Sequence, residues 1–319
     1  MKIFVAGGTG VLGRASVKAL LEAGHHVRAT ARNEEKAQMV REVGAEPIPV
    51  DLYDPKEVRQ AITGCEAVLR LTTKIPPMAK MRNHEAWQET NLLRTEGARI
   101  LVDAAIAEGV EIYVHESVTF VYADGGSEWL TEDSPTDDGA SGILRSALEG
   151  EKEAARFSGS GGRGIVLRFG GFYGIESNQT AEVINLMRRR LMVQPGSGSH
   201  YISSIYIPDA GTAVGAALNV PAGIYNVVDE NPVTFQDYLQ LLADAAHLPK
   251  PFRLPGMVGK ASFGDVWSYL SRSQRVSNAR FKQASGWQPS VASVAQGWPL
   301  VAAALKPAVR AKAQTKTHF

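Results

Sequence analysis

Residues 2–13 read KIFVAGGTGVLG, an apolar run followed by closely spaced glycines, and residues 14–23 continue in a helix-favouring pattern. This is the order strand, glycine turn, helix. Glycines three residues apart let backbone amides at the helix N-terminus approach a pyrophosphate with no Cβ in the way. An ordinary tight turn is the alternative. The stretch predicts a dinucleotide site, with cofactor contacts at Gly7, Gly10, Val11, Leu12 and Gly13.

Composition and charge restrict the class of protein. A chain of 319 residues that is 44% hydrophobic and 21% charged is typical of a globular protein with one large or two unequal domains. Its net charge of +1 gives no general attraction for nucleic acid or a membrane surface. A single cysteine, Cys65, and a start without a signal peptide predict a cytoplasmic protein. No spacing of His, Cys and acidic residues predicts a metal site.

Strand-like and helix-like segments alternate through the first half. The expected strands are residues 2–6, 26–30, 46–50, 67–71, 112–115 and 164–169. The expected helices are residues 14–23, 34–41, 55–63, about 83–107 and about 141–157. This order predicts an α/β fold with a Rossmann-type doubly wound parallel sheet, which binds its ligand beyond the carboxyl ends of the strands.

The alternation loosens after residue 174, which indicates a second, smaller region. We expect a dinucleotide-binding domain over 1–172 plus about 201–228. A mixed α/β substrate domain is expected over about 173–200 and 229–305, followed by a solvated basic tail over 306–319.

Several motifs occur in register along the chain. They are Val50-Asp51-Leu52, Asn91 in residues 89–93, LRFGGFYG at 167–174, Ile207-Pro208-Asp209-Ala210 and Gly286-Trp287-Gln288-Pro289. Together with the glycine turn, they resemble the extended short-chain dehydrogenase/reductase superfamily, in its branch of NAD-dependent sugar-nucleotide epimerases and dehydratases. The resemblance implies that Asp51 and Leu52 lie beside the adenine and that Asn91 supports the active site. It also implies cofactor contacts at Leu71, Thr72, Thr73 and Phe169.

The sequence departs from that family at its proton-transfer pair, a tyrosine and a lysine four residues later. The alignment places Ile143 and Ala147 there, and no Tyr-x-x-x-Lys occurs anywhere in the chain. Neither side chain can move a proton, so a replacement donor must come from the strand ends. The candidates are Ser117, Thr119, Tyr122, Tyr173 and Lys74, each of which could instead be packed or solvated.

The end of the second strand indicates the cofactor. Thr30, Ala31 and Arg32 stand where an NAD-binding protein carries an acid for the ribose hydroxyls. Arg32, helped by Lys36, could make charge-assisted bonds to a 2′-phosphate worth about 1.5 to 3 kcal/mol. We therefore expect NADP, with NAD left open; a solvated arginine at the start of a helix is the alternative.

Two functions remain open from the sequence. The first is an NADP(H)-dependent oxidoreductase that acts on a small carbonyl or sugar-like substrate with a non-standard proton donor. The second is a catalytically silent NADP(H)-binding redox sensor or scaffold protein, which the missing pair favours. A small-molecule substrate is the expected partner, with no nucleic acid or membrane, and a homodimer is left open.

Overall fold

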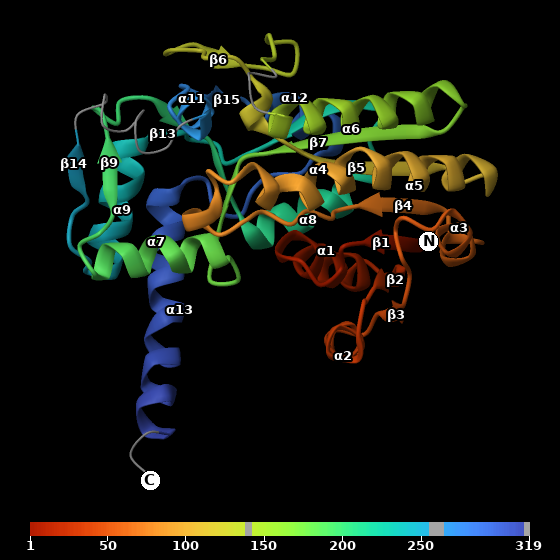
Figure 1. Ribbon diagram of the computed structural model, residues 1–319, viewed down its shortest axis with the longest axis horizontal. Coiled ribbons are helices and arrows are strands. Elements are labelled where there is room, and N and C mark those ends of the chain that lie inside the picture. Colours follow the sequence, from red (N-terminus) through yellow and green to blue (C-terminus); the bar gives the residue numbers. More distant parts are fainter. Residues whose placement is uncertain (138–141, 255–264, 316–319) are drawn as a thin grey trace.

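A seven-stranded parallel sheet forms the centre of the protein (Figure 1). The computed structural model describes residues 1–137, 142–254 and 265–315. The strand order is β12-β7-β5-β4-β1-β2-β3, with each neighbouring pair parallel. The strands are β1 Lys2–Ala6, β2 His26–Thr30, β3 Glu46–Ile48, β4 Ala67–Arg70, β5 Ile112–Val118, β7 Arg163–Phe169 and β12 Gly223–Val227.

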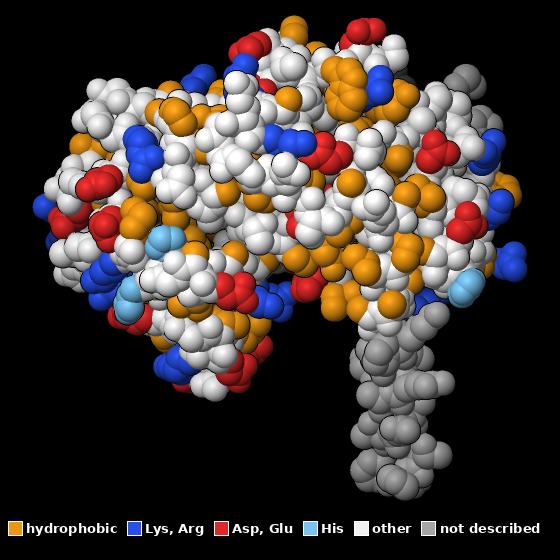
Figure 2. All heavy atoms as spheres, turned by 180° about the vertical axis from the view of Figure 1, so that it is seen from behind, with side chains coloured by type: hydrophobic (Ala, Val, Ile, Leu, Met, Phe, Trp, Pro, Cys, Tyr) orange, Lys and Arg blue, Asp and Glu red, His pale blue; other side chains and the backbone are white. Residues whose placement is uncertain are grey.

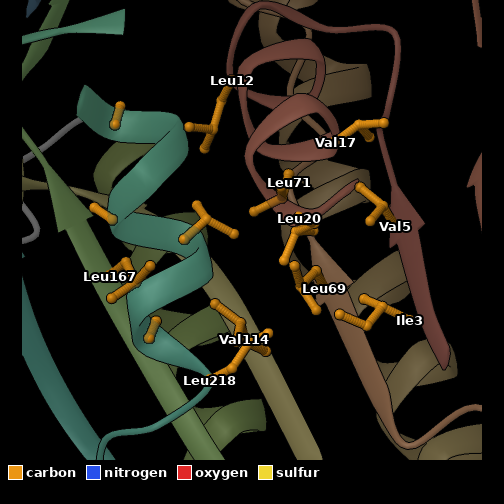
Figure 3. Packing of buried hydrophobic residues seen from close by; sticks show 14 of the residues in the cluster. Ile3, Val5, Leu12, Val17, Leu20, Leu69, Leu71, Val114, Leu167 and Leu218 are labelled. Atoms are coloured by element: carbon orange, nitrogen blue, oxygen red, sulfur yellow. The ribbon is translucent and has the colours of Figure 1, made fainter. Parts of the chain in front are cut away.

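Helices cover both faces of this sheet, because its strands are apolar on both sides. Ile3 and Val5 of β1 pack into one core cluster, whereas Phe4 and Ala6 pack into the other. The first face carries α1 Val11–Glu22, α2 Glu34–Glu42, α8 Ile207–Ala217 and α12 Ala279–Ser285. The second carries α3 Pro55–Ile62, α4 Gln88–Arg94, α5 Glu96–Ala107 and α6 Gly142–Gly159. The predicted Rossmann-type fold is confirmed, and Figure 3 shows α1 and α8 packing over Leu69, Val114 and Leu167.

A second core lies beyond the carboxyl ends of the strands, where the helices α7, α9 and α13 meet (Figure 1). These helices are α7 Asn178–Arg188, α9 Phe235–Ala246 and α13 Val294–Thr315, and α11 covers Asp265–Leu270. The remaining strands form two-stranded pairs: β8 Gly171–Tyr173 with β11 Ser204–Tyr206, β9 Val193–Pro195 with β14 Phe252–Leu254, β10 Tyr201–Ile202 with β13 Val233–Thr234, and β6 Trp129–Leu130 with β15 Arg275–Val276.

The structure differs from the sequence-based expectation in several elements. The helix expected over about 83–107 is divided into the 3-10 turn η2 (His84–Trp87), α4 and α5, with Thr95 at the break. Strand β5 continues to Val118, three residues beyond its expected end, and leads into the 3-10 turn η3 (Thr119–Val121). The expected basic tail from 306 continues α13 as far as Thr315, so the described part of it is helical; residues 316–319 lie outside the described part.

Charged side chains of both signs are distributed over the surface. Figure 2 shows that basic and acidic side chains are interspersed on the face seen from behind Figure 1, which agrees with the near-zero net charge. Within the described residues, no helix combines the length and apolar character needed to cross a membrane.

Candidate functional site

The glycine turn forms a tight cradle between β1 and α1. Gly7 has a φ of +96°, and a Cβ there would lie 2.7 Å from the carbonyl oxygen of Leu71. A Cβ on Gly13 would lie 2.0 Å from the carbonyl oxygen of Gly7, so this position admits only glycine. Gly10 caps α1 without any side-chain hydrogen bond to the first helical amides. The turn therefore presents backbone N–H groups and the positive end of the helix dipole, as a pyrophosphate requires.

A pocket of about 340 Å³, here called the nucleotide pocket, opens beside this turn. It is lined by predicted cofactor residues from four parts of the chain, namely Gly7, Gly10, Arg32, Lys36, Leu52, Leu71, Thr72 and Thr73. Asp51 and Leu52 also line an open outer pocket of about 1000 Å³, which shares Arg32 and Glu89 with the nucleotide pocket. The arrangement is a continuous crevice along the carboxyl ends of β1, β2, β3 and β4, as a dinucleotide needs.

Glu89 of α4 connects two basic residues across this crevice. Nη1 of Arg32 lies 3.2 Å from one carboxylate oxygen of Glu89, and Lys74 donates a hydrogen bond to the other. These hydrogen bonds, first from Lys74 and then from Arg32, lower the pKa of Glu89. Arg32 and Lys74 are both 65% exposed, so the cluster is accessible to a ligand and only weakly held.

An inner pocket of about 450 Å³ continues from the nucleotide pocket, with which it shares Gly10, Leu71, Thr73 and Lys74. Most of its walls are apolar, and they include Val11, Ile75, Trp87, Phe120, Leu144 and Phe172. Val118, which stands at the position where the family resemblance expects a hydroxyl, lines the same pocket. This is the place where a nicotinamide and a small apolar substrate can meet.

Three charged side chains line this pocket: Lys74 after β4, Arg94 of α4 and Glu116 of β5. Glu116 is only 4% exposed, and its Oε2 has no hydrogen-bond partner. Nη1 of Arg70 lies 4.0 Å from this oxygen. Burial raises the pKa of Glu116, although Arg70 and Arg94 counteract part of the shift. The inner pocket thus contains a buried carboxyl group.

Arg70 is held by the main chain around this carboxyl. Its three nitrogens donate to the carbonyl oxygens of Leu93, Glu116 and Thr72 at 3.3, 3.1 and 2.7 Å. The guanidinium is completely buried. His115 lies beside Arg70 in the sheet register, and burial lowers its pKa, so it is a neutral core histidine. Arg70 is therefore the fixed charge nearest to Glu116.

The structure does not bring the predicted hydroxyl donors to the inner pocket. Ser117 Oγ donates to Oε1 of Glu151 at 2.5 Å, and that carboxylate also binds Arg168. The Tyr122 hydroxyl donates to Oδ1 of Asn226 at 2.7 Å, and Thr119 is 1% exposed. All three are buried away from the residues that line the pocket, because β5 and η3 turn these side chains into the protein.

Tyr173 is also buried, in the core formed by α7, α9 and α13. Its ring packs 5.0 Å from that of Trp298, centroid to centroid, and burial followed by Asp229 raises its pKa. Of the five predicted donors, only Lys74 lines the inner pocket. The geometry thus favours packing roles for the other four.

Three of the predicted cofactor residues have packing or hydrogen-bonding roles next to the crevice. Gly13 allows the close contact with Gly7. Asn91 accepts a hydrogen bond of 2.8 Å from Ser146 and so connects α4 with α6. Phe169 is buried, with its ring 5.3 Å from that of Phe172, and it is Phe172 that reaches the pocket.

Sequence reasoning missed Glu89, Arg94 and Glu116. A signal for Glu116 existed, since residues 115–117 place three polar side chains within an otherwise apolar strand. Glu89 and Arg94 stand on an amphipathic helix, where charged residues are ordinary, so nothing in the pattern distinguished them.

Comparisons with known proteins agree with this geometry. A family model described as NAD(P)H-binding matches residues 7–160. The 3-diazoavenalumate denitrifying reductase of a Streptomyces species is 30% identical over 308 residues, which cover 91% of this chain and 96% of that protein. The chain belongs to the same family of NAD(P)H-binding reductases as that protein. Ceramide reductase of Caulobacter vibrioides is a further relative, 25% identical over 93% of this chain and 89% of that protein.

Solved structures of short-chain dehydrogenase/reductase type share the fold over the whole chain. UDP-glucose 4-epimerase from Thermotoga maritima has a TM-score of 0.80 at 20% identity, covering 97% of this chain and 100% of that one. The human epimerase family protein SDR39U1, solved with NADPH, has a TM-score of 0.75 at 22% identity, covering 95% and 99%. The NAD(P)H-binding family model and the reductases among the relatives place the protein in the class of NAD(P)-dependent oxidoreductases.

Proposed function

We propose that this protein is an NADPH-dependent reductase of a small, mostly apolar carbonyl compound. The observation that carries the proposal is the inner pocket, which adjoins the glycine turn and is lined mainly by apolar side chains. A volume of about 450 Å³ suits a nicotinamide together with a small substrate. The apolar walls favour such a compound over a sugar, whose hydroxyls would lose their hydrogen bonds to water there.

The preference for NADPH rests on the nucleotide pocket. It is lined by Arg32, Asn33 and Lys36. The residue at the end of β2 is Thr30, so no acid at that position repels a 2′-phosphate. Gly7 and Gly13 let the turn pack tightly, since a Cβ on either would collide with the carbonyl oxygen of Leu71 or of Gly7. When bound, the cofactor supplies a hydride. The chain's own contribution is to hold both reactants in the inner pocket and to exclude water with Trp87, Phe120 and Phe172.

A diazo compound is a second candidate substrate. The relative that matches over 91% of the chain is named for a reductive denitrification. In such a step the hydride forms an N–H bond at the terminal nitrogen of an aryldiazonium ion, and the aryldiazene then loses N2 and leaves a C–H bond. This reaction needs no acid at a carbonyl oxygen, which would agree with the absence of Tyr-x-x-x-Lys.

Both candidates are tested by following NADPH oxidation with a panel of apolar aldehydes, ketones, quinones and aryldiazonium salts. Turnover of a carbonyl compound supports the first proposal, and turnover of diazonium salts alone supports the second. Tight NADPH binding without turnover of any compound would contradict both and favour a redox sensor.

A further inference from the structure

The missing tyrosine and lysine leave Lys74 as the predicted proton donor that lines the inner pocket, and Glu116 is a second group there that can carry a proton. It is the residue two positions before Val118 on β5, and it lines the inner pocket beside Val118, Phe120 and Leu144. The same pocket contains Gly10 and Val11 of the turn that would hold the cofactor. Glu116 therefore borders the cavity where hydride transfer is proposed.

We propose that Glu116 is the catalytic acid of this protein, donating its proton to the substrate oxygen during carbonyl reduction. The inference rests on the proposed reductase function. The hydride of NADPH adds to the carbonyl carbon and forms a C–H bond, while the electron pair of the C=O π bond moves to oxygen. That oxygen takes the proton of the Glu116 carboxyl and becomes a hydroxyl, and the resulting carboxylate regains a proton from water after product release.

The surroundings of Glu116 suit both of its protonation states. With only 4% exposure, the carboxyl has little water to stabilise a charge, and its Oε2 receives no hydrogen bond. Burial therefore raises its pKa toward the range useful for a general acid. Substrate and cofactor would remove further water and strengthen this effect.

Arg70 and Arg94 act on the other state. Nη1 of Arg70 lies 4.0 Å from Oε2 of Glu116, close enough to stabilise the carboxylate that remains after proton transfer but beyond hydrogen-bond distance. Arg94 of α4 and Lys74 after β4 are the other basic groups that line the pocket, and His115 next to Glu116 is buried and neutral. The neighbouring basic groups can therefore stabilise the carboxylate that forms when Glu116 gives up its proton.

The test compares Glu116→Gln and Glu116→Asp with the wild type on a carbonyl substrate identified from the panel. We expect Glu116→Gln to lower kcat by about a hundredfold to ten-thousandfold with unchanged NADPH affinity. Wild-type kcat should fall as the pH rises through the pKa of the acid, whereas the residual kcat of Glu116→Gln should not show this decrease. Glu116→Asp, which keeps a carboxyl, should retain part of the wild-type kcat and should show the decrease at a different pH.

Controls separate this inference from the proposed function. Glu149→Gln changes an exposed glutamate of α6 and should leave kcat, the pH profile and the melting temperature unchanged. Full turnover by folded Glu116→Gln would overturn the acid role while leaving the reductase proposal intact. Equal loss in Glu116→Asp and Glu116→Gln, with weakened NADPH binding in both, would show a structural role instead. If the wild type reduces no carbonyl compound, both proposals fail together.

Discussion

Nη1 of Arg32 lies 3.2 Å from Oε1 of Glu89, so the guanidinium that we propose as the 2′-phosphate ligand is paired with a carboxylate across the nucleotide pocket. An incoming phosphate must compete with this carboxylate for Arg32 and for Lys74. Because both cations are largely exposed, the competition is weak and reversible. The affinity for NADPH should therefore depend on Glu89 as well as on Arg32.

Replacing Glu89 by Gln should strengthen NADPH binding. Loss of an exposed ion pair of up to about 1 kcal/mol corresponds to an increase in affinity of at most about fivefold. Titration of NADPH fluorescence measures this, with Glu85→Gln on the neighbouring turn η2 as control. A weaker affinity in Glu89→Gln would mean that Glu89 itself binds the cofactor.

Replacing Arg32 by Glu should reverse or erase the preference for NADPH over NADH. The new carboxylate repels the 2′-phosphate and can accept hydrogen bonds from ribose hydroxyls. Thermal shifts with each cofactor at equal concentration report the change, since a ligand that binds the folded state raises its stability. Lys56→Glu, an exposed charge reversal at the start of α3, should keep the wild-type order. Equal shifts from both cofactors in the wild type would contradict the assignment.

The glycines of the turn should differ in their response to substitution. A Cβ on Gly13 would lie 2.0 Å from the carbonyl oxygen of Gly7, so Gly13→Ala should destabilise the fold itself. A Cβ on Gly10 would come no closer than 3.3 Å to that oxygen. Gly10→Val should therefore unfold cooperatively near the wild-type temperature and fail to bind NADPH. Wild-type affinity in Gly10→Val would show that the turn holds no pyrophosphate.

Most of the sheet was predictable from residues 2–115, because apolar strands alternate there with capped helices. Strand β5 was predicted too short, since His115, Glu116 and Ser117 are polar and become buried only through partners such as Arg70 and Glu151. Helix α8 was missed because its Ala- and Gly-rich sequence has no clear periodicity. Gly211 shows the reason for that composition, as a Cβ there would lie 2.6 Å from the backbone of Ala15 in α1.

The residues of the proposed cofactor crevice could be placed together from the sequence in the same way, whereas Glu116, the proposed proton donor, could not. Gly7, Gly10, Arg32 and Lys36 follow strands or start helices, so local sequence places them at one edge of the sheet. Whether a hydroxyl at the end of β5 faces the pocket depends on the local twist of the strand and on η3. The spacing of residues in the sequence predicts neither of these. Glu116 became a candidate only when its burial and its distance from Arg70 were known.

Asp229 should make stability depend on pH. It lies in the core near Tyr173, and burial raises its pKa to about 8. Because this value exceeds that of the unfolded chain, about 3.9, the stabilising contribution is complete below pH 4 and is lost as the pH rises through 8. Chemical denaturation between pH 5 and 9 should show a fall on the order of a few kcal/mol in the free energy of unfolding.

Asp229→Asn should remove this dependence, while Asp244→Asn, an exposed position on α9, should retain it. A wild-type free energy of unfolding that stays constant between pH 5 and 9 would show that Asp229 is ionised throughout.

Transfer of deuterium from NADPH that carries deuterium at both C4 positions of the nicotinamide tests the central claim most directly. The wild type, incubated with labelled NADPH and a carbonyl compound of the panel, should give an alcohol that carries one deuterium on the former carbonyl carbon for each NADPH oxidised. Mass spectrometry of the product measures this ratio. An unlabelled product, or labelled NADPH that stays bound and unoxidised with every carbonyl tested, would contradict the assignment of the protein as an NADPH-dependent carbonyl reductase.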